Sequence, residues 1–192
     1  MSHFFAYMSR MKYISRWGLM RNTQNENIQE HSHQVAMVTH LLALARNRFF
    51  GGAVDCGKAV LLAIYHEAPE VITGDIATPI KYFNPEIKNA YKKIESTASR
   101  KLLDMIPEEL KADYEPFLTM SGIEPEYLII IKAADKICAY LKCVEELKAG
   151  NQEFSKAEKA IRAEIDRMEL PEVKYFMDKF LSSFLLTLDE LN

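Results

Sequence analysis

Apolar residues recur every three to four positions along most of the chain, the spacing of one face of an α-helix. In chain order, the predicted helices cover residues 3–14, 27–49, 55–67, 84–105, 107–119, 124–148, 152–168 and 171–188. Residues 15–27 and 70–79 lack this period and are predicted to be loops. Since no repeat or linker interrupts the pattern, we expect an all-α fold, with residues 1–192 forming a single-domain helical bundle.

Local signals mark where some of these helices begin and end. Asn27 and Glu30 have the spacing of a capping box, and Asp55 is a suitable N-cap for the third helix. Pro69 ends that helix because proline disfavours helical geometry at the residue before it. The apolar run 59–65 has a second interpretation as a buried strand, but the sequence offers no other strand to pair with it.

Three polar residues fall on the apolar faces of three different predicted helices. The faces are Ile28, His31, Val35, Val38 and Leu42; Ala59, Leu62 and His66; and Leu128, Ile131, Asp135, Cys138 and Leu141. A buried carboxylate costs several kcal/mol, on the order of 3–5, unless it is paired or bound to a metal. A bundle brings such faces together, so His31, His66 and Asp135 could share a metal ion, or form a His–Asp hydrogen bond without one.

The neighbours of these histidines refine the candidate site. His33 is excluded as a partner of His31, because residues two apart on a helix point roughly 200° apart. Glu67 directly follows His66 at a helix end, and Glu70 comes next in the predicted loop. Two imidazoles with two carboxylates suit a divalent first-row transition ion that keeps open positions for water and substrate oxygens. Such an ion activates water and neutralises phosphoryl charge, which predicts a hydrolase.

Composition and charge limit the classes of ligand and the cellular location that we expect for this protein. The formal net charge of −3 and the sequence pI near 6.0 disfavour a nucleic-acid polymer as ligand but not a mononucleotide. Cys56, Cys138 and Cys143 form no CxxC pair, and Arg10 and Lys12 interrupt the only early apolar stretch, so no secretory leader is recognisable. No apolar run approaches the roughly 18 residues of a membrane span. We therefore expect a cytoplasmic protein that does not bind membranes.

The order of His31, His66-Glu67 and Asp135 resembles the H…HD…D pattern of HD-domain phosphohydrolases. Further segments are similar to the bacterial 5′-deoxynucleotidases across nearly the whole chain. They include Ser2-His3-Phe4-Phe5, Arg16-Trp17, Glu30-His31-Ser32, Thr73-Gly74-Asp75, Thr78-Pro79, Lys81-Tyr82-Phe83-Asn84 and Cys138-Ala139-Tyr140-Leu141-Lys142-Cys143. The resemblance implies an HD-domain helical bundle that removes the 5′-phosphate from deoxyribonucleoside monophosphates and forms a homodimer.

The resemblance also implies roles for individual residues. One divalent transition metal ion (Co, Mn or similar) would be held by His31, His66, Glu67 and Asp135. Arg16 and Glu70 would be catalytic, Arg16 by orienting the phosphate and Glu70 by supporting turnover. Trp17 would pack against the sugar and disfavour a ribose 2′-hydroxyl. The substrate-binding set would be Arg16, Trp17, His31, Glu67, Asp75, Ile76, Ala77 and Thr78.

Two positions depart from the family pattern. Ala77 stands where the family has a proline, and Glu67 replaces the aspartate that gives the superfamily its name. The extra methylene of Glu67 can move a ligating oxygen by on the order of 1 Å, and such a misplacement can cost about a hundredfold in rate. Two alternatives to the 5′-deoxynucleotidase function therefore stay open. One is a non-catalytic nucleotide-binding or regulatory protein, and the other is a hydrolase of another small phosphomonoester or nucleotide.

Overall fold

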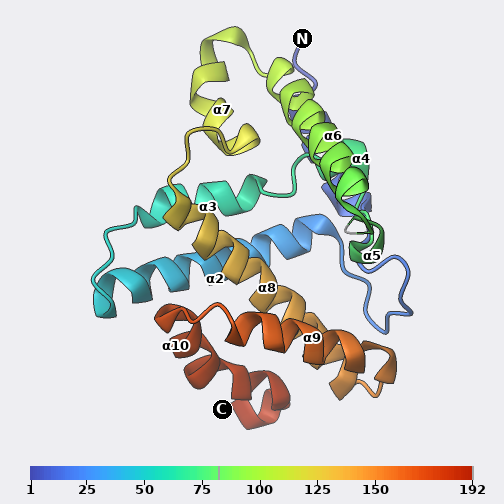
Figure 1. Cartoon of the computed structure of the whole chain (residues 1–192), viewed down its shortest axis with the longest axis vertical. Helices are drawn as coiled ribbons and strands as arrows, with labels where there is room; N and C mark the ends of the chain where they lie inside the picture. Colours follow the sequence, from blue (N-terminus) through green and yellow to red (C-terminus); the bar gives the residue numbers. More distant parts are fainter. Residues whose placement is uncertain (82, 192) are drawn as a thin grey trace. The chain divides into compact units, whose positions relative to one another are not determined.

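The computed structural model describes residues 1–81 and 83–191, and within them all regular secondary structure is helical (Figure 1). The α-helices are α1 (Phe4–Met8), α2 (Ile28–Phe49), α3 (Cys56–Tyr65), α4 (Glu70–Thr73), α5 (Thr78–Lys81), α6 (Pro85–Asp104), α7 (Lys111–Thr119), α8 (Pro125–Lys148), α9 (Ser155–Asp166) and α10 (Pro171–Phe180). Single 3-10 turns cover Met11–Tyr13, Glu108–Leu110, Gln152–Phe154, Leu181–Leu185 and Leu188–Leu191. The all-α prediction is confirmed, while Tyr82 of the 81–84 motif lies outside the described residues.

The predicted capping residues begin the helices that they were expected to begin. The Asn27 side chain accepts a hydrogen bond from the Glu30 backbone N–H at 3.0 Å, and Glu30 accepts one from the Asn27 N–H at 3.4 Å. Asp55 accepts from the backbone N–H of Lys58 at 3.0 Å. Each cap satisfies backbone N–H groups that have no partner within the helix. Polar side chains of the sequence therefore fix the starts of α2 and α3.

Three sequence predictions are wrong in detail. The helix expected over 3–14 stops at Met8, and the one expected over 171–188 ends at Phe180, because 3-10 turns follow both. Residues 70–79 are not one loop, because α4 starts directly after Pro69 and α5 starts at Thr78. Helices of four residues are too short for an apolar period to appear. The run 59–65 is helical, so the strand interpretation is excluded.

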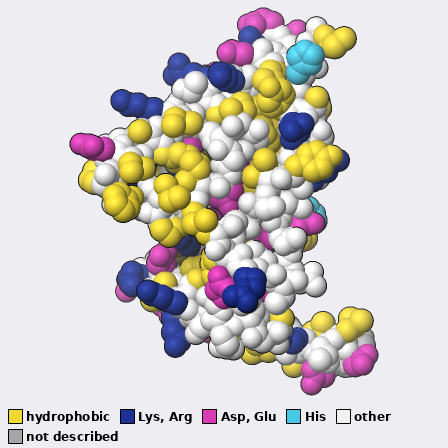
Figure 2. All heavy atoms as spheres, turned by 90° about the vertical axis from the view of Figure 1, so that its right-hand side faces the viewer, with side chains coloured by type: hydrophobic (Ala, Val, Ile, Leu, Met, Phe, Trp, Pro, Cys, Tyr) yellow, Lys and Arg dark blue, Asp and Glu magenta, His cyan; other side chains and the backbone are white. Residues whose placement is uncertain are grey.

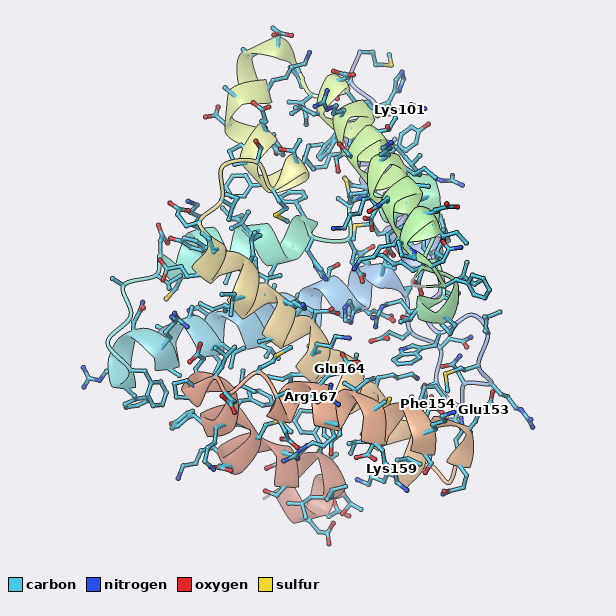
Figure 3. All side chains as sticks on the ribbon, in the orientation of Figure 1. Lys101, Glu153, Phe154, Lys159, Glu164 and Arg167 are labelled. Carbon is cyan, nitrogen blue, oxygen red and sulfur yellow. The ribbon has the colours of Figure 1, made fainter. Side chains whose placement is uncertain are left out.

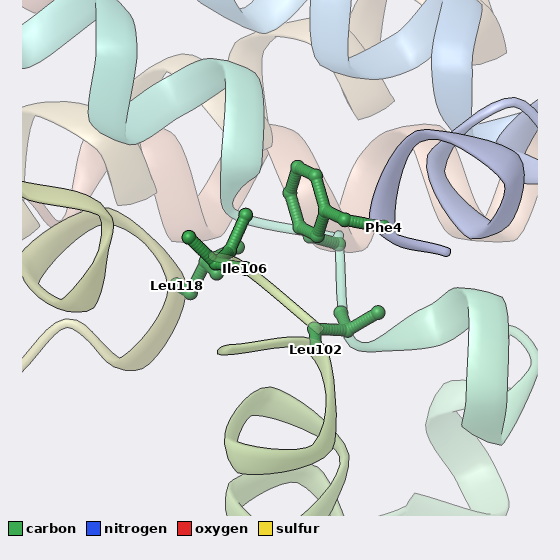
Figure 4. Packing of buried hydrophobic residues seen from close by; sticks show 5 residues of the cluster. Phe4, Leu102, Ile106 and Leu118 are labelled. Atoms are coloured by element: carbon green, nitrogen blue, oxygen red, sulfur yellow. The ribbon is translucent and has the colours of Figure 1, made fainter. Parts of the chain in front are cut away.

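The chain divides into two compact units, which are described separately. The first comprises Met1–Leu19, Asn25–His33 and Leu61–Ile123, and the second Met20–Gln24, Gln34–Val60 and Glu124–Asn192. In the first unit, a buried apolar cluster joins α1, α6, α7 and the turn after α3. Its buried members are Phe4, Ala68, Leu102, Ile106 and Leu118 (Figure 4). This cluster fixes the turn in which two of the candidate site residues lie.

The second unit is built around α8. Ile131, Cys138 and Leu141 are buried on one face of this helix, as the apolar period predicts. Leu128 is an exception, because 40% of it is exposed, and Tyr127 takes the buried position instead. An ion pair of 2.8 Å between Lys136 and Glu164 links α8 to α9, where Figure 3 labels Glu164.

A buried ion pair on α8 anchors the segment Met20–Gln24. Lys142 lies 2.5 Å from the Glu146 carboxylate, which is 1% exposed. Glu146 also accepts hydrogen bonds from the Thr23 backbone N–H at 2.9 Å and from the Thr23 hydroxyl at 2.8 Å. The Asn151 amide donates a further bond of 2.8 Å. Burial alone raises the pKa of Glu146, but these donors and the Lys142 charge outweigh it and lower that pKa.

Replacing Lys142 with methionine is expected to lower the free energy of unfolding by about 3–5 kcal/mol, because the Glu146 charge stays buried without its cation. Urea unfolding followed by circular dichroism measures this loss. Lys174→Met is the matched control, since Lys174 pairs with Asp178 at 2.8 Å with both side chains more than half exposed. Such an exposed pair contributes about 0–1 kcal/mol. Equal losses in the two variants would contradict the assigned role of the buried pair.

The surface carries charges of both signs. On the face drawn in Figure 2, Lys and Arg side chains lie among Asp and Glu side chains and exposed apolar ones. This mixture agrees with the nearly balanced formal charge of −3. No helix in the described part of the chain combines the length and the apolar character that crossing a bilayer requires.

Candidate metal centre

His31 lies in the first turn of α2 and is fully buried, as the apolar period predicts. Its backbone N–H donates to the Asn27 carbonyl at 3.1 Å, so the capped start of the helix fixes its position. The Nε2 atom of the ring lies 3.6 Å from Glu67 Oε1. His33 and His40 are exposed on the same helix, in keeping with the exclusion of His33.

His66 and Glu67 lie in a turn rather than at the end of a helix. α3 ends at Tyr65, and the turn is closed by a 2.9 Å hydrogen bond from the Ala68 N–H to the Tyr65 carbonyl. His66 Nδ1 lies 2.6 Å from the Ala63 carbonyl oxygen. Because a carbonyl only accepts, this contact places the ring proton on Nδ1. Nε2 is then the ring nitrogen whose lone pair would bind a metal ion.

The ligand-type atoms of these three side chains converge within the first unit. Those of His31, His66 and Glu67 lie within 4.8 Å of one another, and Glu67 Oε1 is 3.9 Å from His66 Nε2. Since a transition ion binds such atoms at about 2.0–2.2 Å, two ligands of one ion stand at most about 4.4 Å apart. The measured distances to Glu67 satisfy this limit. Glu67 Oε2 is buried and accepts no hydrogen bond from the described residues, which also fits a cation.

Asp135, the fourth predicted ligand, belongs to the second unit. It lies near the middle of α8 and is partly buried, and Ala134 and Cys138 beside it are fully buried. The sequence prediction that a carboxylate interrupts the apolar face of this helix is therefore confirmed. Its role as a ligand stays a prediction.

The Arg16 side chain approaches the His31 and Glu67 side chains from the segment before α2. The Arg16 backbone N–H donates to the Glu26 carbonyl at 2.9 Å, next to the isolated bridge between Ser15 and Asn27. Its guanidinium Nη1 lies 2.6 Å from Glu26 Oε2, and its Nε lies 3.7 Å from Glu67 Oε1. Arg16 is therefore not a solvated loop residue, because its side chain is only 12% exposed.

Glu26 was not among the predicted site residues. Its Oε1 lies 3.7 Å from His31 Nδ1, so one carboxylate faces both His31 and Arg16. Burial alone raises the pKa of Glu26, but the nearby His31 ring and the positive charge of Arg16 outweigh burial and lower that pKa. The only sequence signal for Glu26 is its position just before the capping residue Asn27.

Glu70 begins α4 and has a strongly shifted protonation equilibrium. Burial raises its pKa to about 9, with a further contribution from the negative charges of Glu67 and Asp75. Lys81 and Arg16 oppose this shift with their positive charges. A carboxyl group that holds its proton near neutral pH can donate it, and a cation beside Glu67 would favour its ionised form.

Trp17 and the segment between α4 and α5 face each other. Trp17 has a φ of +59°, a left-handed conformation that is rare for a bulky residue and is often found at functional sites. Its backbone donates a hydrogen bond to Asp75, whose pKa is nevertheless raised, chiefly by burial. Ile76 and Ala77 are partly buried between α4 and α5, whereas Thr78 is exposed at the first position of α5.

The chain matches known proteins along nearly its whole length. A family model described as 5′-deoxynucleotidase YfbR-like matches residues 3–184. A 5′-deoxynucleotidase of Vibrio cholerae is 53% identical over 191 residues, which cover 100% of this chain and 98% of the relative. The 5′-deoxynucleotidase YfbR of Escherichia coli is 51% identical over 191 residues, which cover 100% of this chain and 96% of the relative.

Solved structures share the fold at lower identity. An HD-domain phosphohydrolase from Listeria innocua aligns with a TM-score of 0.82 at 23% identity, covering 97% of this chain and 90% of the other. The HD phosphohydrolase DatZ of cyanophage S-2L, solved with dA and one catalytic Zn²⁺ ion, aligns with a TM-score of 0.65 at 22% identity. That alignment covers 93% of this chain and 95% of DatZ.

Proposed function

The chain belongs to the 5′-deoxynucleotidase YfbR-like family of HD-domain phosphohydrolases, and we propose that it removes the 5′-phosphate from deoxyribonucleoside monophosphates by metal-dependent hydrolysis. The single observation that carries the catalytic part of the proposal is the convergence of His31, His66 and Glu67, whose ligand atoms lie within 4.8 Å of one another. The Arg16 guanidinium, 3.7 Å from the same Glu67 carboxylate, places a phosphate-binding group beside them.

We assign one divalent transition metal ion, such as Co or Mn, to His31, His66, Glu67 and Asp135. The donor set of two imidazoles and two carboxylates supports such an ion, and DatZ, a protein of the same fold, binds one catalytic Zn²⁺. Asp135 is proposed as the fourth ligand because it is a partly buried carboxylate near the middle of α8, beside the fully buried residues Ala134 and Cys138. When bound, the ion lowers the pKa of water and offsets phosphoryl charge.

Two side chains of the protein are proposed to bind the phosphate group and to assist proton transfer from the attacking water. Arg16, held by Glu26 at 2.6 Å, presents a fixed guanidinium to the phosphate oxygens. Glu70 assists proton transfer or positions the attacking water, since its partly buried carboxyl group begins α4 three residues beyond Glu67. Both side chains belong to the first unit, as do the two imidazoles.

The sugar of the nucleotide is proposed to bind between Trp17 and the segment that joins α4 and α5. The hydrogen bond from the Trp17 backbone to Asp75 supports a common binding surface for these two residues. This surface continues toward α5 through Ile76, Ala77 and Thr78. The phosphate group of the nucleotide would lie beside His31 and Glu67. The Trp17 ring would exclude a ribose 2′-hydroxyl by filling the space that the hydroxyl needs.

Glu67 decides between this proposal and its closest alternative, a protein that binds nucleotides without hydrolysing them. The extra methylene relative to aspartate does not prevent contact with the histidines, because Glu67 Oε1 lies 3.6 Å and 3.9 Å from their Nε2 atoms. The turn after Tyr65 carries the longer side chain at this distance. We therefore expect activity without a Glu67→Asp substitution.

Phosphate release from deoxyribo- and ribonucleoside monophosphates, measured with added Mn²⁺ or Co²⁺, tests the proposal. We expect the chain to hydrolyse the deoxyribonucleotides preferentially, and Trp17→Ala to reduce that preference by about 10-fold, since a contact with one small group contributes about 1–3 kcal/mol. No release by the wild type, with activity appearing in Glu67→Asp, would favour the non-catalytic alternative. Preference for another phosphomonoester or a nucleoside triphosphate would favour the other alternative.

Other properties of the protein are proposed on more general grounds. We propose that residues 1–192 act as one domain and that the protein is a cytoplasmic homodimer, as the resemblance implies. The family match over residues 3–184 supports one functional domain. The balanced charge supports a mononucleotide ligand rather than a nucleic-acid polymer.

A further inference from the structure

We propose that Glu26 is a positioning residue that orients His31 for metal binding and holds Arg16 away from the ligand Glu67. This inference rests on the proposed function and adds a residue to its machinery. The geometry that carries it lies entirely within the first unit. Glu26 Oε1 lies 3.7 Å from His31 Nδ1, while Glu26 Oε2 lies 2.6 Å from Arg16 Nη1.

The backbone holds Glu26 in this position. The Glu26 carbonyl accepts a 2.9 Å hydrogen bond from the Arg16 N–H, and the Ile28 N–H donates to the Ile14 carbonyl at 3.0 Å. These two bonds flank the isolated bridge between Ser15 and Asn27. The side chains of Glu26 and Arg16 are each 12% exposed, so water competes little for their contact. The carboxylate is therefore fixed before any ligand enters.

The two nitrogens of His31 face two different carboxylates. Nε2 lies 3.6 Å from Glu67, which is assigned to the metal, and Nδ1 faces Glu26. A histidine that ligates through Nε2 carries its proton on Nδ1, and an acceptor beside Nδ1 favours this tautomer and this ring orientation. Glu26 is the carboxylate beside His31 Nδ1 and at 3.7 Å acts on the ring through its charge, whereas the Ala63 carbonyl lies within hydrogen-bond distance of His66 Nδ1, at 2.6 Å.

Arg16 faces the same two carboxylates, and only one of them is needed for the metal. Its Nε lies 3.7 Å from Glu67 Oε1, whereas its bond to Glu26 is shorter by about 1 Å. Without the Glu26 charge, the guanidinium would pair more strongly with Glu67 and compete with the cation for its oxygens. Glu26 thus supports metal binding through His31 and through Arg16.

Glu26→Gln tests the inference by metal binding as well as by activity. We expect the affinity of the metal-free protein for Co²⁺, measured by calorimetry, to fall about 10- to 100-fold, as for other partners of ligating histidines. The visible absorption spectrum of the Co²⁺ complex is expected to change, because the orientation of His31 changes. In the enzymatic assay, KM for the nucleotide is expected to rise as Arg16 loses its support.

Glu30→Gln is the matched control. It removes the same charge near the start of α2, but Glu30 is exposed and contacts the Asn27 backbone rather than the site. We expect wild-type Co²⁺ affinity and an unchanged spectrum for this variant. If Glu26→Gln does not fold, Glu26→Asp carries the test, since it keeps the charge and withdraws the carboxylate by one methylene. Weaker Co²⁺ binding by folded Glu26→Asp is then the expected result.

The possible outcomes separate this inference from the proposed function. Wild-type Co²⁺ affinity and spectrum in folded Glu26→Gln, in a protein whose wild type hydrolyses deoxyribonucleotides, would overturn the role of Glu26 alone. The same result for Glu26→Asp would overturn it if only that variant folds. A wild type that binds no Co²⁺ and releases no phosphate would overturn both. Equal losses in Glu26→Gln and Glu30→Gln would show a general charge effect and overturn the positioning role.

Discussion

Replacing His66 with alanine is expected to lower kcat/KM for deoxyribonucleoside monophosphates by at least about 10³-fold, the largest effect of any single substitution that we predict. His66 presents Nε2 toward Glu67 Oε1 at 3.9 Å, and its Nδ1 is held by the Ala63 carbonyl. Loss of this ligand weakens the hold on an ion whose charge stabilisation is worth several kcal/mol, and about 1.36 kcal/mol corresponds to tenfold in rate. Phosphate release and metal analysis of the purified variant measure both losses.

His33→Ala is the control for this substitution. His33 is exposed on α2 two residues beyond His31, so its removal tests the loss of a histidine that does not face the cluster. We expect wild-type metal content and rate for it. Metal bound at the wild-type level in His66→Ala, together with wild-type turnover, would refute the assignment of His66 as a ligand.

Glu70→Gln is expected to lower kcat by about 10²- to 10⁴-fold while leaving the metal content unchanged. The substitution keeps the size of the side chain but removes the proton that the buried carboxyl group exchanges. The pKa of that carboxyl group is raised to about 9, chiefly by burial and further by the negative charges of Glu67 and Asp75. Steady-state kinetics with saturating Mn²⁺ measure the change, which should appear in kcat more than in KM.

Glu86→Gln provides the comparison for Glu70. Glu86 is exposed in the first turn of α6, where it lies near a helix start as Glu70 does. We expect its kcat to equal that of the wild type. A decrease in metal content that accounts for the whole loss in Glu70→Gln would assign Glu70 to metal retention instead of proton transfer.

The parts of the fold that sequence predicts well are those with a local physical signal. The side chains of Asn27, Asp55 and Asn84 cap the helices that follow them, and each cap depends on residues two or three positions away. The apolar period also places His31 on the buried side of α2. These features need no knowledge of the distant parts of the chain.

The features that sequence misses depend on contacts between distant residues. Glu26 pairs with Arg16 across ten positions of irregular chain, for which no periodic pattern exists. Leu128 is a second example. The apolar period of its helix predicts that it is buried, but it is exposed and Tyr127 is buried instead. His31, His66 and Asp135 are predictable from sequence because three polar residues on the apolar faces of three helices are uncommon together, whereas the ligand role of Glu67 follows from the family resemblance.

The charges around Glu70 have a consequence for the order in which ligands enter. The carboxylates of Glu26, Glu67 and Asp75 lie in the first unit with the cationic side chains of Arg16 and Lys81, and Lys81 already pairs with Glu95 at 2.8 Å. A phosphate dianion that arrives first meets a negative potential and is repelled. A cation that arrives first reverses that potential. Hydrolysis by this protein should therefore follow a compulsory sequence, with the metal loaded before each nucleotide can dock.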